Sequence, residues 1–276
     1  MKIRKLVTAD EYREVERLQS DVWKFPDREI IPLNELVILQ KHGGQVFGAF
    51  NGDGRMIAFC FGQPGYRDGR VYHYSRMLGV MPEYRDSGIG HTLKLKQREF
   101  VLKQGLDVVQ WAFDPLQSRN AYFNIEKLGC VIREYNENLY PGSDSRFNRG
   151  LEPDRFTAEW PIASRRVRDR LAGRKESYAL EDYPALLPSS GSDGGWRRPA
   201  EALARPAGKR LSIEVPADIN GLKDDDVKLA QRWRLMTRAA FQLAFKKGYV
   251  VRGFLSPVED GRRRSHYLLE KNFKVR

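Results

Sequence analysis

The sequence predicts an α/β (α+β) fold, and three observations support this prediction. Segments rich in β-branched and aromatic residues alternate with segments whose apolar residues recur at helical spacing. Residues 70–104 read as one strand, a tight turn and one helix. In addition, 41% of the 276 residues are hydrophobic, which is ordinary for a globular protein and sufficient for a core without disulfides or metals.

The other elements are arranged around residues 70–104. Val71–Val80 is rich in β-branched and aromatic residues, and Pro82 ends it. The sequence RDSGIG follows at 85–90, and a helical run then continues to Gly105, a typical C-cap. The glycines of this turn let the backbone bend sharply and approach a ligand. The N–H groups of the first helical turn, at the positive end of the helix dipole, suit a pyrophosphate.

Capping and turn signals predict the elements before this stretch. Thr8 and Glu11 form a capping box that begins a helix, and a hairpin turn at 51–54 joins two strands. We expect strands at Ile3–Val7, Gln45–Phe50 and Met56–Gly62, and helices at Thr8–Val22 and Pro32–Gln40.

Four further elements are expected after Gly105. A strand over Leu106–Phe113 is stopped by Asp114-Pro115, and a short helix over Ser118–Leu128 is closed by Gly129. Strands over Cys130–Tyr135 and Arg155–Trp160 follow.

Two motifs carry a resemblance to a known family. Leu78-Gly79-Val80, a proline-containing connection and Arg-x-x-Gly-x-Gly at 85–90 resemble the acyl-CoA-binding motif of the GCN5-related N-acetyltransferases, the GNAT superfamily. NIEKLGC at 124–130 resembles that superfamily's helix-to-strand ending, and both motifs stand in family order. A dinucleotide fingerprint is excluded because Leu93 stands where its third glycine belongs, and a P-loop is excluded because no Gly-Lys-Ser/Thr follows. The alternative is a structural strand–loop–helix with incidental glycines.

The resemblance covers residues 1–162 and implies a complete acyl-CoA-binding GNAT domain there. Its sheet would be central, mixed, mostly antiparallel, splayed after the central strand and flanked by helices. Residues 163–210, which include SSGSDGG at 189–195, are rich in Arg, Pro, Gly and Ser and are expected to form a linker or long loop. Residues 211–276 predict a β-α-β-β extension that packs on the GNAT sheet or extends it.

The helix of this extension has consistent boundary signals. Three aspartates at 224–226 precede it, and Gly248 ends it. Strands are expected at Tyr249–Leu255 and His266–Leu269. One helical stripe should face the core, and its members are Leu229, Trp233, Met236, Ala240 and Leu243.

The resemblance implies direct transfer of an acetyl or other short acyl group from acyl-CoA, the co-substrate, to an amine of a small molecule or protein. The amine must be neutral and the thioester carbonyl polarised. By position, the backbone at 78–80 is assigned to the pantetheine and thioester, with one N–H as oxyanion donor, and 85–91 to the pyrophosphate. The residues assigned to acyl-CoA are Leu78, Gly79, Val80, Arg85, Asp86, Ser87, Gly88, Ile89, Gly90, His91 and, as a weaker contact, Asn120.

Three residues are candidates for the general base. His73 is the first choice because an imidazole near neutral pH can take an ammonium proton through water. Asp114 and Glu83 are the alternatives. His73 can equally be a half-buried strand histidine, and Asp114 can cap the helix after it.

The sequence departs from the family pattern at the expected general acid. The family's tyrosine falls on Ile125, which has no proton to donate, and Tyr122 lies one turn earlier on nearly the same face. The acid is dispensable if the thiolate leaves unaided, since a thiol pKa is about 8.5. The alternative function is therefore a non-catalytic acyl-CoA-binding or regulatory protein.

The net charge of +12 and the isoelectric point near 9.7 indicate anionic partners. A phosphorylated cofactor and nucleic acid both meet this condition, but no aromatic-interleaved basic strand or recognition helix supports nucleic acid. Arginines 165, 166, 168, 170, 174 and 262–264 carry much of the excess, and a solvated basic surface explains them.

Cys60 and Cys130 stand in apolar, strand-like segments, which indicates buried thiols and not a disulfide or metal pair. No apolar run reaches the length of a membrane span, and MKIRKLVTADEY lacks a signal-peptide core. We expect a cytoplasmic protein with no metal. A homodimer is left open.

Overall fold

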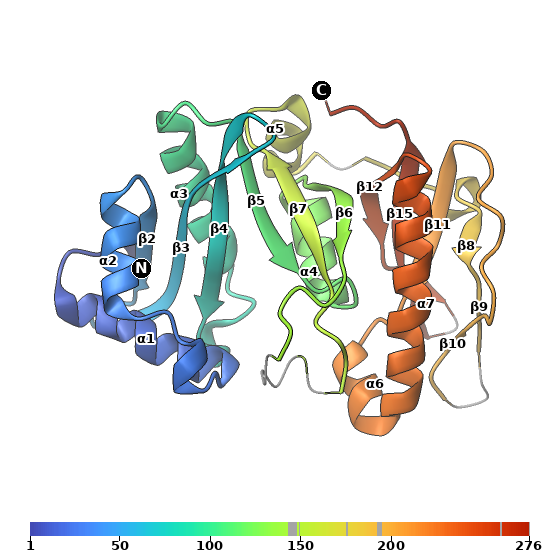
Figure 1. The fold of residues 1–276 in the computed structure, drawn as a ribbon, viewed down its shortest axis with the longest axis horizontal. Helices are drawn as coiled ribbons and strands as arrows, with labels where there is room; N and C mark the ends of the chain where they lie inside the picture. The colour runs from blue at the N-terminus through green and yellow to red at the C-terminus, as the bar shows by residue number, and fades with distance from the viewer. Residues whose placement is uncertain (143–147, 149, 175, 192–194, 260, 276) are drawn as a thin grey trace. The chain divides into compact units, whose positions relative to one another are not determined.

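The structure is a computed structural model that describes residues 1–142, 148, 150–174, 176–191, 195–259 and 261–275. It has the predicted α/β architecture, with helices flanking mixed, mostly antiparallel sheet (Figure 1). The chain divides into two compact units, and the division falls within strand β5 (Val108–Phe113). Unit 1 ends at Trp111, and unit 2 begins at Ala112.

Unit 1 contains a sheet in the order β1-β2-β3-β4-β5. Neighbouring strands are antiparallel except β4 and β5, which are parallel. The elements are β1 (Lys2–Lys5), α1 (Ala9–Trp23), α2 (Leu33–Lys41), β2 (Gln45–Phe50), β3 (Met56–Arg67), β4 (Arg70–Val80), α3 (Ile89–Lys103) and the start of β5. Thr8 caps α1 through the predicted capping box with Glu11.

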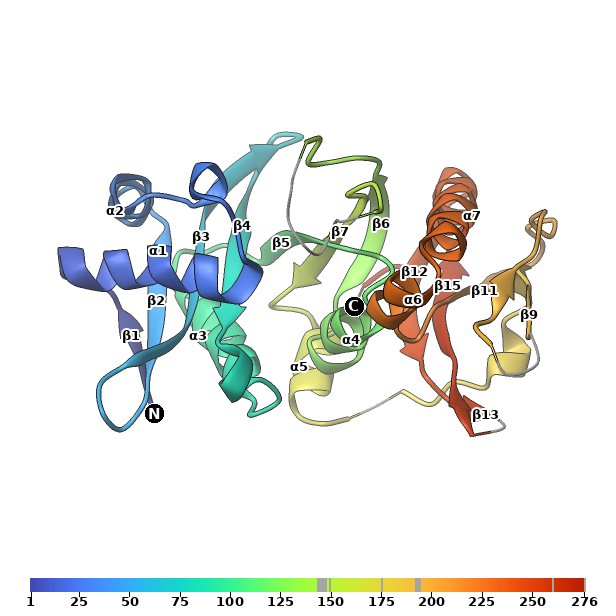
Figure 2. The same ribbon diagram turned by 90° about the horizontal axis from the view of Figure 1, so that it is seen from below.

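Helices flank this sheet (Figures 1 and 2), and two apolar cores lie on its opposite faces. On one face α1 and α2 pack against β2 and β3 through buried residues such as Leu18, Leu36 and Phe59. On the other face α3 packs through Ile89 and Leu93. Because β2 and the first half of β3 are covered on both faces, Gln45–Phe50 and residues 56–61 are buried throughout and apolar at nearly every position.

Strands β3 and β4 form a long hairpin that is interrupted by a β-bulge. Phe61 pairs with Met77 and Gly62 pairs with Ser75, which leaves Arg76 without an opposite residue. β3 therefore extends to Arg67, five residues beyond the predicted end at Gly62. A bulge bends its strand and increases the local twist, and it lies here two residues before the part of β4 that is assigned to acyl-CoA, 78–80.

Unit 2 begins with the predicted helix over Ser118–Leu128, but its second half is wider than an α-helix. α4 (Ser118–Tyr122) continues as a π-helical turn, Phe123–Lys127, before Gly129. β6 (Val131–Asn136) and β7 (Arg155–Pro161) follow as an antiparallel pair.

The predicted C-terminal extension continues the sheet of unit 2, whose order is β7-β6-β12-β15-β11-β8. The contact with β6 comes from β12, where Val251 pairs with Ile132. The elements are β8 (Ala185–Leu187), β11 (Arg210–Val215), α6 (Ile219–Asp225), α7 (Val227–Lys246), β12 (Tyr249–Leu255) and β15 (Ser265–Lys271). The short strands β13 (Val258–Glu259) and β14 (Arg262–Arg263) form a separate hairpin.

Helix α7 is capped by Asp226, as the aspartate cluster predicts, but its buried face is rotated from the predicted stripe. Leu229, Trp233 and Ala240 are buried, whereas Met236 and Leu243 are only partly covered. The remaining buried positions are Ala230, Arg234, Thr237, Phe241 and Ala244. The buried face therefore includes two polar side chains, Arg234 and Thr237, that the predicted apolar stripe does not contain.

Residues 163–210, predicted as a linker or long loop, contain short regular elements. They are α5 (Arg165–Leu171), a 3-10 turn at Leu180–Asp182, β8, β9 (Ser189–Ser190) and β10 (Arg198–Pro199). β8 joins the sheet parallel to β11. Residues 175 and 192–194 of this segment lie outside the described part of the chain. The division at Trp111 also differs from the predicted boundary at 162, because β6, β7 and the extension share one sheet.

Cys60 and Cys130 are free and fully buried, as predicted. In the part of the chain that the structure describes, no helix is long and apolar enough to cross a membrane. The same residues contain no group of three or more His, Cys, Asp or Glu side chains arranged to hold a metal.

Candidate acyl-CoA site

The turn between β4 and α3 has the backbone conformation that its glycines predict. Gly88 is the N-cap of α3 with φ of +83°, and Asp86 is also left-handed with φ of +63°. A Cβ added at Gly88 would meet no atom within 4 Å, so the position is open on its outer side. Arg85, Ser87 and Gly88 are exposed, and Ser87 Oγ donates a hydrogen bond of 2.5 Å to the Tyr84 carbonyl.

The first N–H groups of α3 are available to a ligand. Among the described residues, no hydrogen bond is recorded for the backbone N–H of Gly88, Ile89 or Gly90, and the first recorded one is Thr92 N–H to the Gly88 carbonyl at 3.1 Å. No side chain caps this end. An uncapped helix start with convergent N–H groups binds phosphate oxygens without a special side chain. The turn therefore fits the diphosphate of an acyl-CoA.

The start of α3 packs against the end of β4, so the turn is held next to the strand assigned to pantetheine. A Cβ added at Gly90 would lie 3.5 Å from Leu78 Cδ2 and 3.8 Å from Val80 Cγ2. Gly79 between them is buried, and a Cβ there would lie 2.8 Å from Phe59 Cε1 and 2.9 Å from Trp23 Cη2. Glycine is required at 79 by this close packing.

The parallel pairing of β4 with β5 is short. The recorded pairs in unit 1 are His73 with Val109 and Tyr74 with Gln110. Within the described residues of unit 1, no partner on the β5 side is recorded for Ser75–Val80, whereas on its other side β4 pairs with β3 as far as Val80. Successive residues of a strand direct their backbone groups to opposite edges, so Leu78 and Val80 present N–H and C=O groups on the β5 side, which suits the amide groups of a pantetheine arm.

His73, the first-choice base, lies inside unit 1. It is fully buried, its ring packs edge-on against Phe100, and its Nε2 lies 3.4 Å from the amide nitrogen of Gln97. Burial, together with the Lys94 ammonium, lowers the pKa of His73 to about 4. An enclosed imidazole with this pKa is neutral at pH 7 and has poor access to an acceptor, so the environment favours a packing role.

Asp114 lies in unit 2, at the end of β5, and its carboxylate is occupied. Arg234 of α7 donates to Oδ1 at 2.8 Å and to Oδ2 at 2.7 Å, and the Leu116 N–H donates to Oδ1 at 2.8 Å. The Arg234 side chain is only 2% exposed. Asp114 therefore stabilises the Asp-Pro turn and a buried guanidinium, which leaves little capacity to accept a substrate proton.

Glu83 is the most accessible of the three base candidates. It lies in the 3-10 turn Pro82–Tyr84 that follows β4, and its side chain is half exposed. Its recorded ion pair is a long one, 3.9 Å from the Arg55 guanidinium. The structure therefore leaves Glu83 open to solvent next to the β4–α3 turn.

His91 lies in the first turn of α3 in unit 1, and the predicted residues of the short helix lie in unit 2. Asn120 is exposed on α4, and Tyr122 is partly buried at its end, with the Lys127 ammonium 5.9 Å from its ring centre. Ile125 is fully buried in the π-helical turn. The position at which the resemblance implies a tyrosine thus lies in the core and is not exposed.

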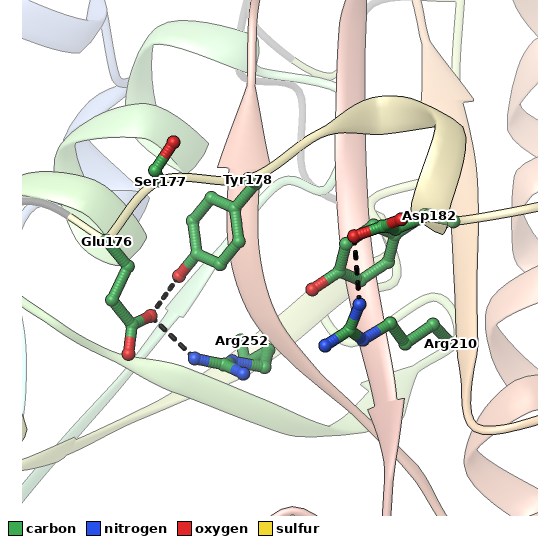
Figure 3. Close-up of a pocket in the computed structure, with 7 residues that line it drawn as sticks. Glu176, Ser177, Tyr178, Asp182, Arg210 and Arg252 are labelled. Atoms are coloured by element: carbon green, nitrogen blue, oxygen red, sulfur yellow. Dashed lines mark hydrogen bonds and ion pairs between the residues drawn. The ribbon is translucent and has the colours of Figure 1, made fainter.

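The expected solvated basic surface is only partly present. Arg166 and Arg170 are buried, and their guanidinium groups lie within 3.4 Å of the Glu176 carboxylate, which also pairs with Arg252 at 2.6 Å. A cavity of about 290 Å³ adjoins this cluster (Figure 3), lined by Glu176, Ser177, Tyr178, Asp182, Tyr183, Arg210 and Arg252. Arg210, at its other end, pairs with Asp182 at 3.0 Å. Because these arginines form ion pairs with carboxylates of unit 2, much of their charge is neutralised within that unit.

Sequence reasoning missed two features of unit 1: the bulge at Arg76 and the buried Lys94. Lys94 follows Leu93 on the inner face of α3, where only an apolar residue is expected. Its partner Ser75 lies 19 residues earlier, and no local signal links the two positions.

No family model matches the sequence, and no curated protein matches it. Solved structures do. The ribosomal-protein-S18-alanine N-acetyltransferase from Escherichia coli is 20% identical, covering 58% of this chain and 93% of that one with a TM-score of 0.46. A Desulfovibrio desulfuricans protein assigned to the acetyltransferases of the GNAT family is 16% identical over 59% and 99%, with a TM-score of 0.48. Aminoglycoside 6'-acetyltransferase type Ii is 18% identical over 60% and 99%, also with a TM-score of 0.48.

Similarity at these identities concerns the fold and not the substrate. Residues 2–161 contain, in order, a strand, two helices, three strands, a glycine turn with a helix, a strand, a short helix and two strands. That order, the short parallel pairing of β4 with β5 and the glycine turn at the start of α3 agree with the arrangement that the resemblance implies for residues 1–162.

Proposed function

We propose that the protein is an N-acyltransferase that moves an acetyl or other short acyl group from acyl-CoA directly to an amine of a small molecule or protein. The observation that carries this proposal is the uncapped start of α3, where no hydrogen bond is recorded, among the described residues, for the backbone N–H groups of Gly88, Ile89 and Gly90. Acyl-CoA would supply the activated thioester, and this chain would bind, align and polarise it.

In this proposal the diphosphate lies on the turn at 85–91 and the pantetheine arm along the β4 edge at 78–80. The Arg85 side chain, exposed at the turn, adds a charged donor to the backbone N–H groups. A backbone N–H of β4 at 78–80 donates a hydrogen bond to the thioester carbonyl oxygen and stabilises the developing oxyanion. No metal is required for this chemistry.

For the proton we propose Glu83, directly or through water, as the base that removes a proton from the acceptor's ammonium group, so that the neutral amine attacks the thioester. Of the three candidates it is the accessible one, since His73 is enclosed and Asp114 is held by Arg234. Tyr122 is the proposed acid for the departing thiolate. The amine acceptor, the cytoplasmic location and a homodimer stay proposals that accompany this assignment.

The second candidate function is an acyl-CoA-binding or regulatory protein without transfer. Ile125 favours it, because a buried isoleucine stands where the resemblance implies a proton donor. This candidate predicts acyl-CoA binding with no acceptor-dependent reaction.

One experiment separates the two. Purified protein is first tested for thermal stabilisation by CoA and acetyl-CoA, and then for release of free thiol from acetyl-CoA over a panel of polyamines, aminoglycosides and peptides with free N-termini. Amine-dependent thiol release above the background hydrolysis rate supports the transferase. Stabilisation without any amine-dependent release supports the binding protein, and the absence of both contradicts the site.

A further inference from the structure

Lys94 is a buried cation in the middle of unit 1. Its side chain comes from the inner face of α3, and the residue is 4% exposed. Its ammonium donates hydrogen bonds to Ser75 Oγ at 2.8 Å and Gln97 Oε1 at 3.2 Å, and lies 3.7 Å from the centre of the Trp111 ring. Burying an ammonium is costly, so these contacts must be retained for the position to be tolerated.

The Lys94 ammonium contacts the two residues that follow the last pair of the β4–β5 ladder. The last recorded pair is Tyr74 with Gln110, and the next residue on each strand is Ser75 on β4 and Trp111 on β5. Lys94 contacts both of these residues. The ammonium therefore lies at the point where the ladder ends, one residue before the bulge at Arg76.

We propose that Lys94 is a positioning residue for the acyl-CoA substrate, a wedge that holds Ser75 and Trp111 apart. Paired strands lie about 4.8 Å apart, and closing Ser75 onto Trp111 to that spacing would displace the ammonium from its hydrogen-bond and aromatic partners. The cost of an unpaired buried charge opposes this closure. The β4 edge from Ser75 to Val80 is thus kept free for the pantetheine arm, so the inference rests on the proposed function.

The wedge is also fixed relative to the diphosphate turn. Lys94 lies on the same helix as Ile89 and Gly90, whose N–H groups are assigned to the diphosphate. The diphosphate and the pantetheine arm of a bound acyl-CoA are therefore both positioned by one helix, α3. Lys96, on the same helix, is a contrast: its side chain is 43% exposed and pairs with Glu99 at 2.8 Å.

The test compares Lys94→Met with the control Lys96→Met, which makes the same substitution on the solvent side of α3. Calorimetric affinities are measured for CoA and for ADP, which has the diphosphate but no pantetheine arm. We expect Lys94→Met to bind CoA at least about tenfold more weakly than wild type and ADP equally well. Lys96→Met should match wild type for both ligands. Equal CoA affinity in Lys94→Met and wild type overturns the wedge, and so does an equal loss for CoA and ADP.

Hydrogen exchange in the ligand-free protein gives a readout that a merely structural role would not produce. If β4 and β5 close in Lys94→Met, amides in Ser75–Val80 exchange more slowly than in wild type. A variant that is only destabilised exchanges them faster, and this result or unchanged exchange overturns the wedge. If Lys94→Met does not fold, Lys94→Gln takes its place and Lys94→Arg should restore CoA affinity. If wild type binds neither CoA nor ADP, the proposed function fails, and the wedge as a substrate-positioning device fails with it.

Discussion

At the scale of single residues, charges buried inside the two units are the features that sequence patterns miss most. Arg234 and Asp114 are 120 positions apart, and a single sequence carries no signal that pairs them. The predicted apolar stripe of α7 does not include position 234, yet Arg234 is buried beside Trp233. Asp114, interpreted from its place after a strand as a candidate base, has its carboxylate held by that arginine.

Asp114→Asn is expected to destabilise the protein by about 3–5 kcal/mol, because it leaves the Arg234 guanidinium buried without its counter-charge. Urea unfolding at pH 7 measures the change. The control is Asp182→Asn, which breaks a surface pair with Arg210 (side chains 58% and 45% exposed) and should cost less than about 1 kcal/mol. Equal losses in the two variants would contradict the buried pair.

His73 predicts a pH dependence of stability. Because its folded pKa of about 4 lies below the unfolded value of 6.5, the unfolded chain takes up the proton first as pH falls. The stabilisation is present above pH 6.5 and is lost between pH 6.5 and 4, by on the order of 1–3 kcal/mol. Unfolding free energies at pH 7, 6 and 5 should show this loss in wild type and a smaller slope in His73→Gln. Parallel slopes would show that the imidazole is solvated.

At the scale of elements, local signals predicted most of what the structure contains. The capping box of α1, the glycine turn before α3 and the Asp226 cap of α7 involve neighbours in sequence, and all three are present. The bulge at Arg76, the π-helical turn after α4 and strand β8 were not predicted, because each depends on pairing or packing with distant residues. The burial of Lys94 was not predicted for the same reason, since it depends on contacts with Ser75, 19 residues earlier. The candidate acyl-CoA turn, in contrast, is made of neighbouring residues and could be predicted from the sequence.

The turn itself is tested by Gly88→Ala, with Gly69→Ala in the β3–β4 hairpin as control. Both glycines have positive φ, +83° and +76°, and a Cβ at either meets no atom within 4 Å. Each alanine should therefore cost about 1 kcal/mol of stability from backbone strain alone. Only Gly88→Ala should weaken CoA binding, by about tenfold or more in a calorimetric titration. A similar effect of both variants on CoA affinity would argue against the turn as the diphosphate site.

At the scale of the whole molecule, the C-terminal extension is part of the fold and not an appended module. Phe156 of β7 is fully buried and lies 4.7 Å, between ring centres, from Phe241 of α7 and 5.5 Å from Tyr267 of β15. β12 pairs directly with β6. A domain boundary at 162 looks natural from composition, but composition does not reveal that strands on both sides of it share one sheet.

A chain cut after residue 162 should therefore lose its fixed tertiary structure. Removing α7, β12 and β15 exposes the Phe156 ring and the β6 edge, which favours aggregation. Near-ultraviolet circular dichroism and size-exclusion chromatography of the fragment against the full chain measure this. A monodisperse fragment with native aromatic signals would contradict the structural role of the extension.

The central claim, that the start of α3 binds the diphosphate of an acyl-CoA, is tested most directly by a crystal structure of the protein grown with CoA. The account predicts phosphate oxygens within hydrogen-bond distance of the N–H groups of Gly88, Ile89 and Gly90, and the pantetheine arm along β4 at 78–80. A CoA molecule bound elsewhere, or a turn left empty at saturating CoA, would contradict it.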